Sequence, residues 1–228
     1  MSTTLSNIAR IRAVNHALGE LAAEAVYVGG SVVSLYSSRP ASDIRPTDDV
    51  DVLLELATYK DYTNIDLVLR QKGFENDIES GVICRYRING IIVDVMPIND
   101  QILGFTNRWY EAGFAGRQKI EIEPELTIYL FQPVHFLASK IEAFDSCGGG
   151  DGRTSTDFED IVYLLNNREQ IWNEINTSSE DVKSYIRDQL RTWADSPYIE
   201  EWLSCHLDYN EQRRATFIKG GLIALGGM

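Results

Sequence analysis

Two short stretches decide the fold of this chain: Tyr-Val-Gly-Gly-Ser at residues 27–31 and Thr-Asp-Asp-Val-Asp-Val-Leu-Leu at residues 47–54. The first is typical of a short strand that ends in a glycine turn, and the second of a strand with alternating carboxylates. Side chains two apart on a strand point to the same face, so Asp49 and Asp51 can share one cation. Since their neighbours are apolar, ionised carboxylates are costly there unless paired or metal-bound. A metal site is therefore the leading prediction.

A third carboxylate is predicted to join this pair. Asn89-Gly90 separates two β-rich runs, 82–88 and 91–96, and is a strong signal for a tight hairpin. Asp94 lies in the second run, so its strand can lie beside the strand of the first two aspartates. Three carboxylates on one sheet face require cations, and such oxygen ligands suit Mg²⁺ or Mn²⁺. Taken singly, each aspartate could instead end a strand or a turn, or form an ion pair with an arginine such as Arg45.

The glycine turn has two interpretations. Gly29-Gly30-Ser31 lies between a strand and the first turns of a predicted helix, so its backbone amides and the Ser31 hydroxyl could approach a phosphate closely. A Gly-Gly pair alone is more often only a turn. Its position one strand before the Asp49 and Asp51 strand favours the phosphate-binding hypothesis.

The remaining periodicity predicts an α+β chain. Apolar spacing indicates an amphipathic helix over residues 4–24, and alternation of charge with isoleucine at 119–123 indicates an edge strand. From Pro133 onward the spacing is helical almost to the end of the chain. We therefore predict a mixed-sheet domain with flanking helices over residues 1–132 and a C-terminal helical bundle over 133–228. The core of this bundle is expected to include Trp172, Trp193 and Trp202.

Composition limits the function classes. The chain has 228 residues with 44% hydrophobic content, and 21 Lys plus Arg against 34 Asp plus Glu give a net charge of −13. Such a surface repels nucleic acid on average, so binding of phosphate must rest on a local basic patch or on metal ions. The three cysteines have neither disulfide nor zinc spacing, and no export or membrane-spanning segment is visible. These features predict a soluble cytoplasmic protein with no membrane partner.

Together the motifs resemble a known superfamily. The Gly-Gly-Ser turn at 29–31, the Thr-x-Asp-x-Asp strand at 47–51 and Val-Asp-Val-Met-Pro at 93–97 resemble the DNA polymerase β-type nucleotidyltransferases. Within that superfamily, Lys-Ile-Glu-Ala at 140–143 and Asp-Phe-Glu-Asp-Ile at 157–161 resemble the AbiEii/AbiGii toxin family. The resemblance extends from about residue 25 to residue 166. It departs from the family in the long loop between Ser31 and Asp49 and in the Thr-Ser-Thr at 154–156, where basic residues are frequent.

The resemblance implies roles for particular residues. Phosphates would be held by Gly30 and Ser31, Mg²⁺ by Asp49 and Asp51, the triphosphate by Lys140, and the nucleotide site would be supported by Asp157. Without the resemblance, Lys140 would be a solvated helix residue that borders an apolar face, and Asp157 a carboxylate favoured at a helix N-terminus.

The predicted activity is Mg²⁺-dependent transfer of a nucleotide from an NTP to an acceptor hydroxyl, with Asp94 completing the metal site and taking the acceptor proton. The resemblance implies a toxin that modifies tRNA and is controlled by a cognate antitoxin. The acidic charge argues against a large RNA acceptor, so a small molecule or a protein side chain stays open. Two non-enzymatic alternatives are a nucleotide-binding or antitoxin-binding module without turnover and a purely structural protein.

Overall fold

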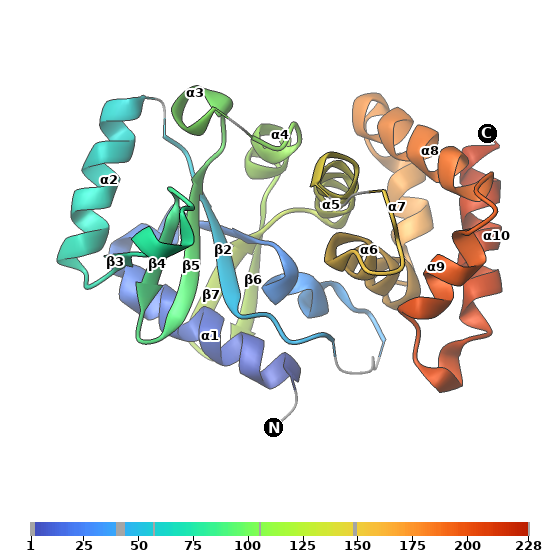
Figure 1. The fold of residues 1–228 in the computed structure, drawn as a ribbon, viewed down its shortest axis with the longest axis horizontal. Helices are drawn as coiled ribbons and strands as arrows, with labels where there is room; N and C mark the ends of the chain where they lie inside the picture. Colours follow the sequence, from blue (N-terminus) through green and yellow to red (C-terminus); the bar gives the residue numbers. More distant parts are fainter. Residues whose placement is uncertain (1–2, 40–43, 57, 105, 148–149, 228) are drawn as a thin grey trace. The chain divides into compact units, whose positions relative to one another are not determined.

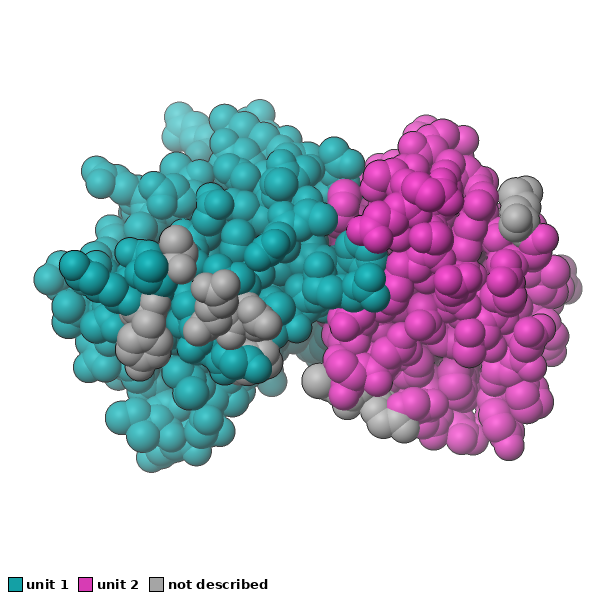
Figure 2. All heavy atoms as spheres, turned by 90° about the horizontal axis from the view of Figure 1, so that it is seen from above, with its two compact units in different colours: residues 1–35, 43–132 teal, residues 36–42, 133–228 magenta. Residues whose placement is uncertain are grey.

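A computed structural model describes residues 3–39, 44–56, 58–104, 106–147 and 150–227. The chain divides into two compact units, coloured separately in Figure 2. The first unit comprises Met1–Leu35 and Asp43–Gln132, and the second comprises Tyr36–Ser42 and Pro133–Met228. The α+β class is confirmed, with the sheet in the N-terminal part and helices after it.

The first unit is built on a mixed seven-stranded sheet of order β3-β4-β5-β2-β1-β7-β6. The strands are β1 (Val26–Val28), β2 (Asp49–Leu54), β3 (Glu75–Asn76), β4 (Arg85–Ile88), β5 (Ile91–Pro97), β6 (Gln118–Glu123) and β7 (Leu126–Leu130). β2 is antiparallel to β1 and parallel to β5, so the carboxylate strand lies in the middle of the sheet. β6 pairs with β7 at the edge, as its charge alternation predicts.

Helices cover this sheet. The helical segments that begin in the first unit are α1 (Thr3–Leu18), η1 (Gly19–Ala23), η2 (Gly30–Tyr36), α2 (Tyr59–Gln71), η3 (Ile78–Ser80), α3 (Asp100–Leu103) and α4 (Tyr110–Ala115). α1 contacts β2 and β5, and it buries Ile11, Val14 and Leu18 (Figure 1). α2 begins at a capping box formed by Thr58 and Asp61, which satisfies free backbone donors of its first turn. The sequence prediction for residues 31–36 was a helix, and these residues form the tighter 3-10 helix η2.

The two faces of the central strands differ in polarity. On one face Val50, Val52, Val93 and Val95 are almost fully buried. The residues between them alternate to the other face, which carries the aspartates. The burial of these valines stabilises the strands that carry the aspartates, by roughly 1.5–3 kcal/mol for each fully buried side chain.

The second unit is helical. Its helices are α5 (Pro133–Cys147), α6 (Thr156–Asn167), α7 (Ile171–Thr177), α8 (Glu180–Ala194), α9 (Ile199–Cys205), the 3-10 helix η4 (Tyr209–Glu211) and α10 (Arg214–Gly226). This confirms the helical periodicity after Pro133. Phe158 stacks edge-on against Trp193 and Trp202, and both tryptophans are buried as predicted. The prediction is wrong for Trp172, which is only half-buried.

None of the described helices has both the length and the apolar composition needed to cross a membrane.

Candidate functional site

The sheet brings the three predicted carboxylates together. β2 and β5 run parallel, with Asp51 directly opposite Asp94. One carboxylate oxygen each from Asp49, Asp51 and Asp94 lies within 4.8 Å of the other two. Asp49 and Asp51 are half-buried, whereas Asp94 is 8% exposed. We call these three residues the carboxylate cluster; hard divalent cations prefer such a set of oxygen donors.

The glycine turn lies against this cluster. Val28 pairs with Asp51 across the antiparallel strands β1 and β2, and Gly29 follows with a φ of 73°. A Cβ atom at Gly29 would overlap the Oδ2 atom of Asp51. Glycine is therefore required at this position for two reasons, the left-handed backbone and the close approach of the carboxylate.

The next two residues present polar groups beside the cluster. A Cβ atom at Gly30 would overlap the Nη2 atom of Arg45, so this guanidinium lies directly against the turn. The side chain of Ser31 is 1% exposed, and its hydroxyl makes no hydrogen bond with any described residue. A buried hydroxyl without a partner costs free energy, which an additional ligand could recover. A cation and a hydroxyl donor beside a glycine turn are suited to a phosphate.

A residue that sequence reasoning missed, Arg85, neutralises part of the cluster. Its Nε and Nη2 atoms donate to Oδ1 and Oδ2 of Asp94 at 2.8 and 2.7 Å, a bidentate fork. Its Nη2 atom also lies 4.0 Å from Oδ2 of Asp49. The signal was present in the sequence, because counting outward from the two-residue turn Asn89-Gly90 places Arg85 opposite Asp94.

The cluster nevertheless keeps an excess of negative charge. Arg85 lies beside these three carboxylates, and the guanidinium of Arg45 lies against the adjoining turn. The pKa of Arg85 is raised first by its hydrogen bonds to Asp94 and further by the charges of Asp49 and Asp51. The negative charge of the cluster also affects the pKa of the buried thiol of Cys84. Burial and the charge of Asp94 raise the pKa of Cys84 to about 11. A cation of higher charge than arginine would balance these groups better.

Arg85 also borders a pocket of about 300 Å³ in the same unit. The apolar part of its lining comes from Ile78, Val82 and Ile83, which are exposed. Apolar side chains and a charged group at one hollow are typical of small-ligand sites. A molecule bound there would lie beside Arg85, the residue that holds Asp94.

The two helical candidates lie in the second unit and contact each other. The Nζ atom of Lys140 on α5 lies 2.9 Å from Oδ1 of Asp157 and 2.7 Å from Oδ2 of Asp160, both on α6. Although burial opposes the charged form, Asp160 and Asp157 hold the pKa of Lys140 above its usual value. We call these three residues the lysine cluster. Lys140 is 8% exposed, so the alternative of a solvated surface lysine is wrong.

Asp160 was missed as a member of this cluster. It lies three residues after Asp157 and therefore on the same face of α6, a spacing that the sequence already displays. Ser155, not Asp157, provides the N-cap of this helix, since its side chain accepts a hydrogen bond from the backbone amide of Phe158. The roles of Lys140 and Asp157 in nucleotide binding stay predictions.

Comparisons with known proteins leave the family open. No protein-family model matches the chain, and no curated protein matches it. The functional assignment therefore depends on the chemistry of the residues themselves.

Proposed function

We propose that this protein is a divalent-metal-dependent nucleotidyltransferase that moves a nucleoside monophosphate from an NTP to an acceptor hydroxyl. One observation carries the proposal: oxygens of Asp49, Asp51 and Asp94 lie within 4.8 Å of one another. The turn at Gly29 touches Asp51, so a phosphate-binding element and a candidate metal site adjoin. This arrangement agrees with the resemblance to polymerase β-type enzymes of the AbiEii/AbiGii toxin family.

The donor set of the cluster fits Mg²⁺ or Mn²⁺. All three side chains offer carboxylate oxygens, and their negative excess over Arg85 favours a dication. When bound, such ions activate an attacking oxygen and stabilise the charge on a leaving phosphate. We assign the ligand role to all three aspartates.

The chain's own groups then have distinct tasks. Ser31 and Arg45, with the backbone amides of Gly29-Gly30, hold the β- and γ-phosphates and stabilise the charge that accumulates on them. Asp94 accepts the proton of the acceptor hydroxyl. The acceptor oxygen forms a bond to the α-phosphorus, the bond from that phosphorus to the β-phosphate bridge breaks, and pyrophosphate leaves.

The finer assignments follow from the resemblance. We propose that Lys140 and Asp157 contribute to the nucleotide site and that the helices after Pro133 form a bundle. The proposed acceptor is tRNA, the proposed regulator is a cognate antitoxin, and the proposed compartment is the cytoplasm. A small molecule or a protein is the alternative acceptor.

Substitution in the cluster tests the proposal. The protein is incubated with Mg²⁺ or Mn²⁺, each α-labelled NTP and a cell lysate that contains RNA, and both labelled products and released pyrophosphate are measured. The Asp51→Asn variant should abolish turnover while its circular dichroism and unfolding curve stay native. Asp48→Asn is the matched control, since the Asp48 side chain is 91% exposed, lies outside the cluster and forms a long ion pair of 3.8 Å with Arg10. Full turnover by Asp51→Asn would sink the proposal.

The Arg85 fork favours one second candidate, a nucleotide-binding module without turnover. A guanidinium that bonds both oxygens of Asp94 occupies the directions from which a cation would approach. The two functions separate in one assay, because the module binds labelled NTP and releases no pyrophosphate. The enzyme does both.

A further inference from the structure

The second unit contains a basic pocket with aromatic walls. The pocket has a volume of about 200 Å³ and includes Arg39, Arg168, Arg214, Trp172 and Phe217 in its lining. Three arginines at one hollow are notable in a chain whose net charge is −13. The lining also includes one carboxylate, Glu169, so the three arginines leave a net positive charge there, as a phosphate-binding role requires in an acidic protein.

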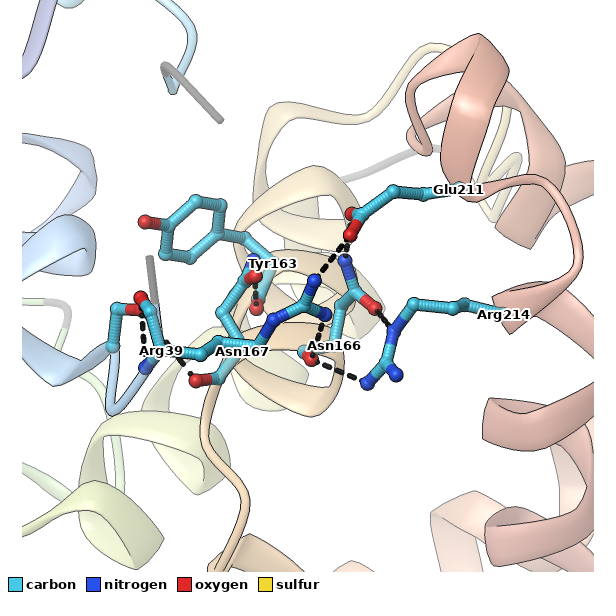
Figure 3. A network of polar contacts seen from close by, with 7 residues as sticks. Arg39, Tyr163, Asn166, Asn167, Glu211 and Arg214 are labelled. Carbon is cyan, nitrogen blue, oxygen red and sulfur yellow. Dashed lines mark hydrogen bonds and ion pairs between the residues drawn. The ribbon is translucent and has the colours of Figure 1, made fainter. Parts of the chain in front are cut away.

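Two of the arginines converge on one asparagine. The Nη2 atom of Arg214 donates to the backbone oxygen of Asn166 at 2.7 Å, and its Nε atom donates to the side-chain oxygen of the same residue. Arg39 reaches the same backbone oxygen from the other side, at 3.4 Å (Figure 3). Asn166 is 4% exposed and also donates to Glu211, so it orients both guanidinium groups.

The charges around this asparagine are not evenly paired. Glu211 bonds Arg39, and Glu174 bonds Arg168. Within the described part of the chain, no carboxylate lies within ion-pair distance of Arg214, whose contacts are with the amide of Asn166 and the ring of Phe217. Burial and the positive charge of Arg39 lower the pKa of Arg214, and Glu211 and Glu169 only partly offset this effect. An added anion would relieve the repulsion between the two arginines.

The aromatic walls offer a surface for a flat ring. Phe217 is 54% exposed, and Trp172 is half-buried. The indole of Trp172 is fixed from behind, because a Cβ atom at Gly221 of α10 would overlap it. Bases stack on such side chains, and arginines beside them bind the attached phosphate.

We propose that this pocket binds a nucleoside phosphate, with the phosphate at Arg39 and Arg214 and the base against Trp172 and Phe217. Its volume of about 200 Å³ suits one phosphate with part of a nucleoside rather than a longer ligand. The ligand is a free nucleotide or the terminal nucleotide of an RNA strand. The site requires no metal ion and does not depend on the proposed transfer reaction, since all its residues belong to the second unit.

Binding in the presence of EDTA tests this site in the full-length protein. Titrations with AMP, adenosine, inorganic phosphate and a 5′-phosphorylated hexaribonucleotide are followed by calorimetry and tryptophan fluorescence. AMP or the hexamer should bind more tightly than adenosine or phosphate, because both halves of the pocket are then filled. Tighter binding of AMP identifies the free nucleotide as the ligand, and tighter binding of the hexamer identifies an RNA end.

Neighbouring arginines supply a matched control. Arg214→Gln should weaken binding at least about tenfold, as expected for the loss of a charge-assisted hydrogen bond. Arg213→Gln removes the same charge from an exposed position outside the pocket lining and should change the affinity by less than about twofold. Phe217→Leu, which leaves the asparagine contacts intact, should weaken binding about fivefold or more. The proposal is overturned if neither ligand binds saturably in EDTA, if both arginine variants weaken binding equally, or if Phe217→Leu has no effect.

Discussion

The carboxylate cluster of the sheet and the lysine cluster of the helices place aspartates beside a cation in opposite ways. In the lysine cluster, one buried ammonium lies within 2.9 Å of two carboxylates, and Asp160 is almost fully enclosed. In the carboxylate cluster, three aspartates lie beside Arg85, and the Asp49 side chain is 41% exposed. The first arrangement holds two helices of the second unit together. The second leaves a negative excess that solvent and ions can reach, which is what a binding site requires.

Removing the lysine should have the largest effect on stability. Lys140→Met leaves Asp157 and Asp160 without their cation, and an uncompensated buried charge costs about 3–5 kcal/mol of unfolding free energy. Urea unfolding measures this loss. Lys219→Met is the control, because the ion pair between Lys219 and Glu200 is exposed and contributes less than about 1 kcal/mol. Equal losses in both variants would show that the lysine cluster is not a stabilising contact.

Replacing Gly29 of the glycine turn with alanine should cause the next-largest loss of stability. Gly29→Ala both strains a backbone of φ 73° and displaces the Asp51 carboxylate, so we expect a loss of about 2–4 kcal/mol. Gly81→Ala has the same strain at φ 71° but meets no atom within 4 Å, so only about 1–2 kcal/mol should be lost. Mn²⁺ binding, followed by electron paramagnetic resonance, should disappear in the first variant alone. If Gly81→Ala abolished it as well, the link between the turn and the carboxylates would be wrong.

Metal ions should stabilise the wild-type protein. A ligand at 100 times its dissociation constant raises the unfolding free energy by about 2.7 kcal/mol, visible as a higher melting temperature in Mn²⁺. Lys140→Met should keep this shift, because the proposed metal ligands include no residue of the lysine cluster. Asp51→Asn should lose it. An unchanged shift in Asp51→Asn would place the metal elsewhere.

The smallest effect on stability is expected from replacing Arg85, the cation that pairs with Asp94. Arg85→Met should lower stability by about 1 kcal/mol, since its partly exposed pair with Asp94 is screened by water. Mn²⁺ should nevertheless bind severalfold more tightly, because the competing positive charge is gone. The control is Arg87→Met. Arg87 lies two residues after Arg85 on β4, and its substitution breaks an ion pair with Asp77. Weaker Mn²⁺ binding in Arg85→Met would mean that Arg85 supports the metal site instead of competing for it.

Local sequence patterns predicted that the three carboxylates lie close together but did not predict their contact with Arg85. The two-residue period of a strand placed Asp49 beside Asp51, and the Asn-Gly turn indicated that Asp94 would lie close. The same turn register places Arg85 opposite Asp94, although the sequence prediction included only Asp94. Edge strand β6 and the helices after Pro133 also followed from periodicity.

Long-range relations were not visible in the sequence. The parallel pairing of β2 with β5 and the position of β1 between β2 and β7 join segments far apart in the chain. The basic pocket likewise combines Arg39 with Arg214, and no local period relates them. Trp172 was assigned to the core because helical spacing identifies a face of a helix without showing whether another helix covers it.

The parallel register of β2 and β5 also determines when the carboxylate cluster can exist during folding. Asp51 meets Asp94 only after these two distant strands have paired, and such non-local parallel pairing is slow to form. An unfolded chain therefore offers Asp49 and Asp51 alone, a weak ligand for any dication. If the cluster binds a metal as proposed, its affinity depends on the completed sheet, and the ion would slow unfolding without accelerating collapse.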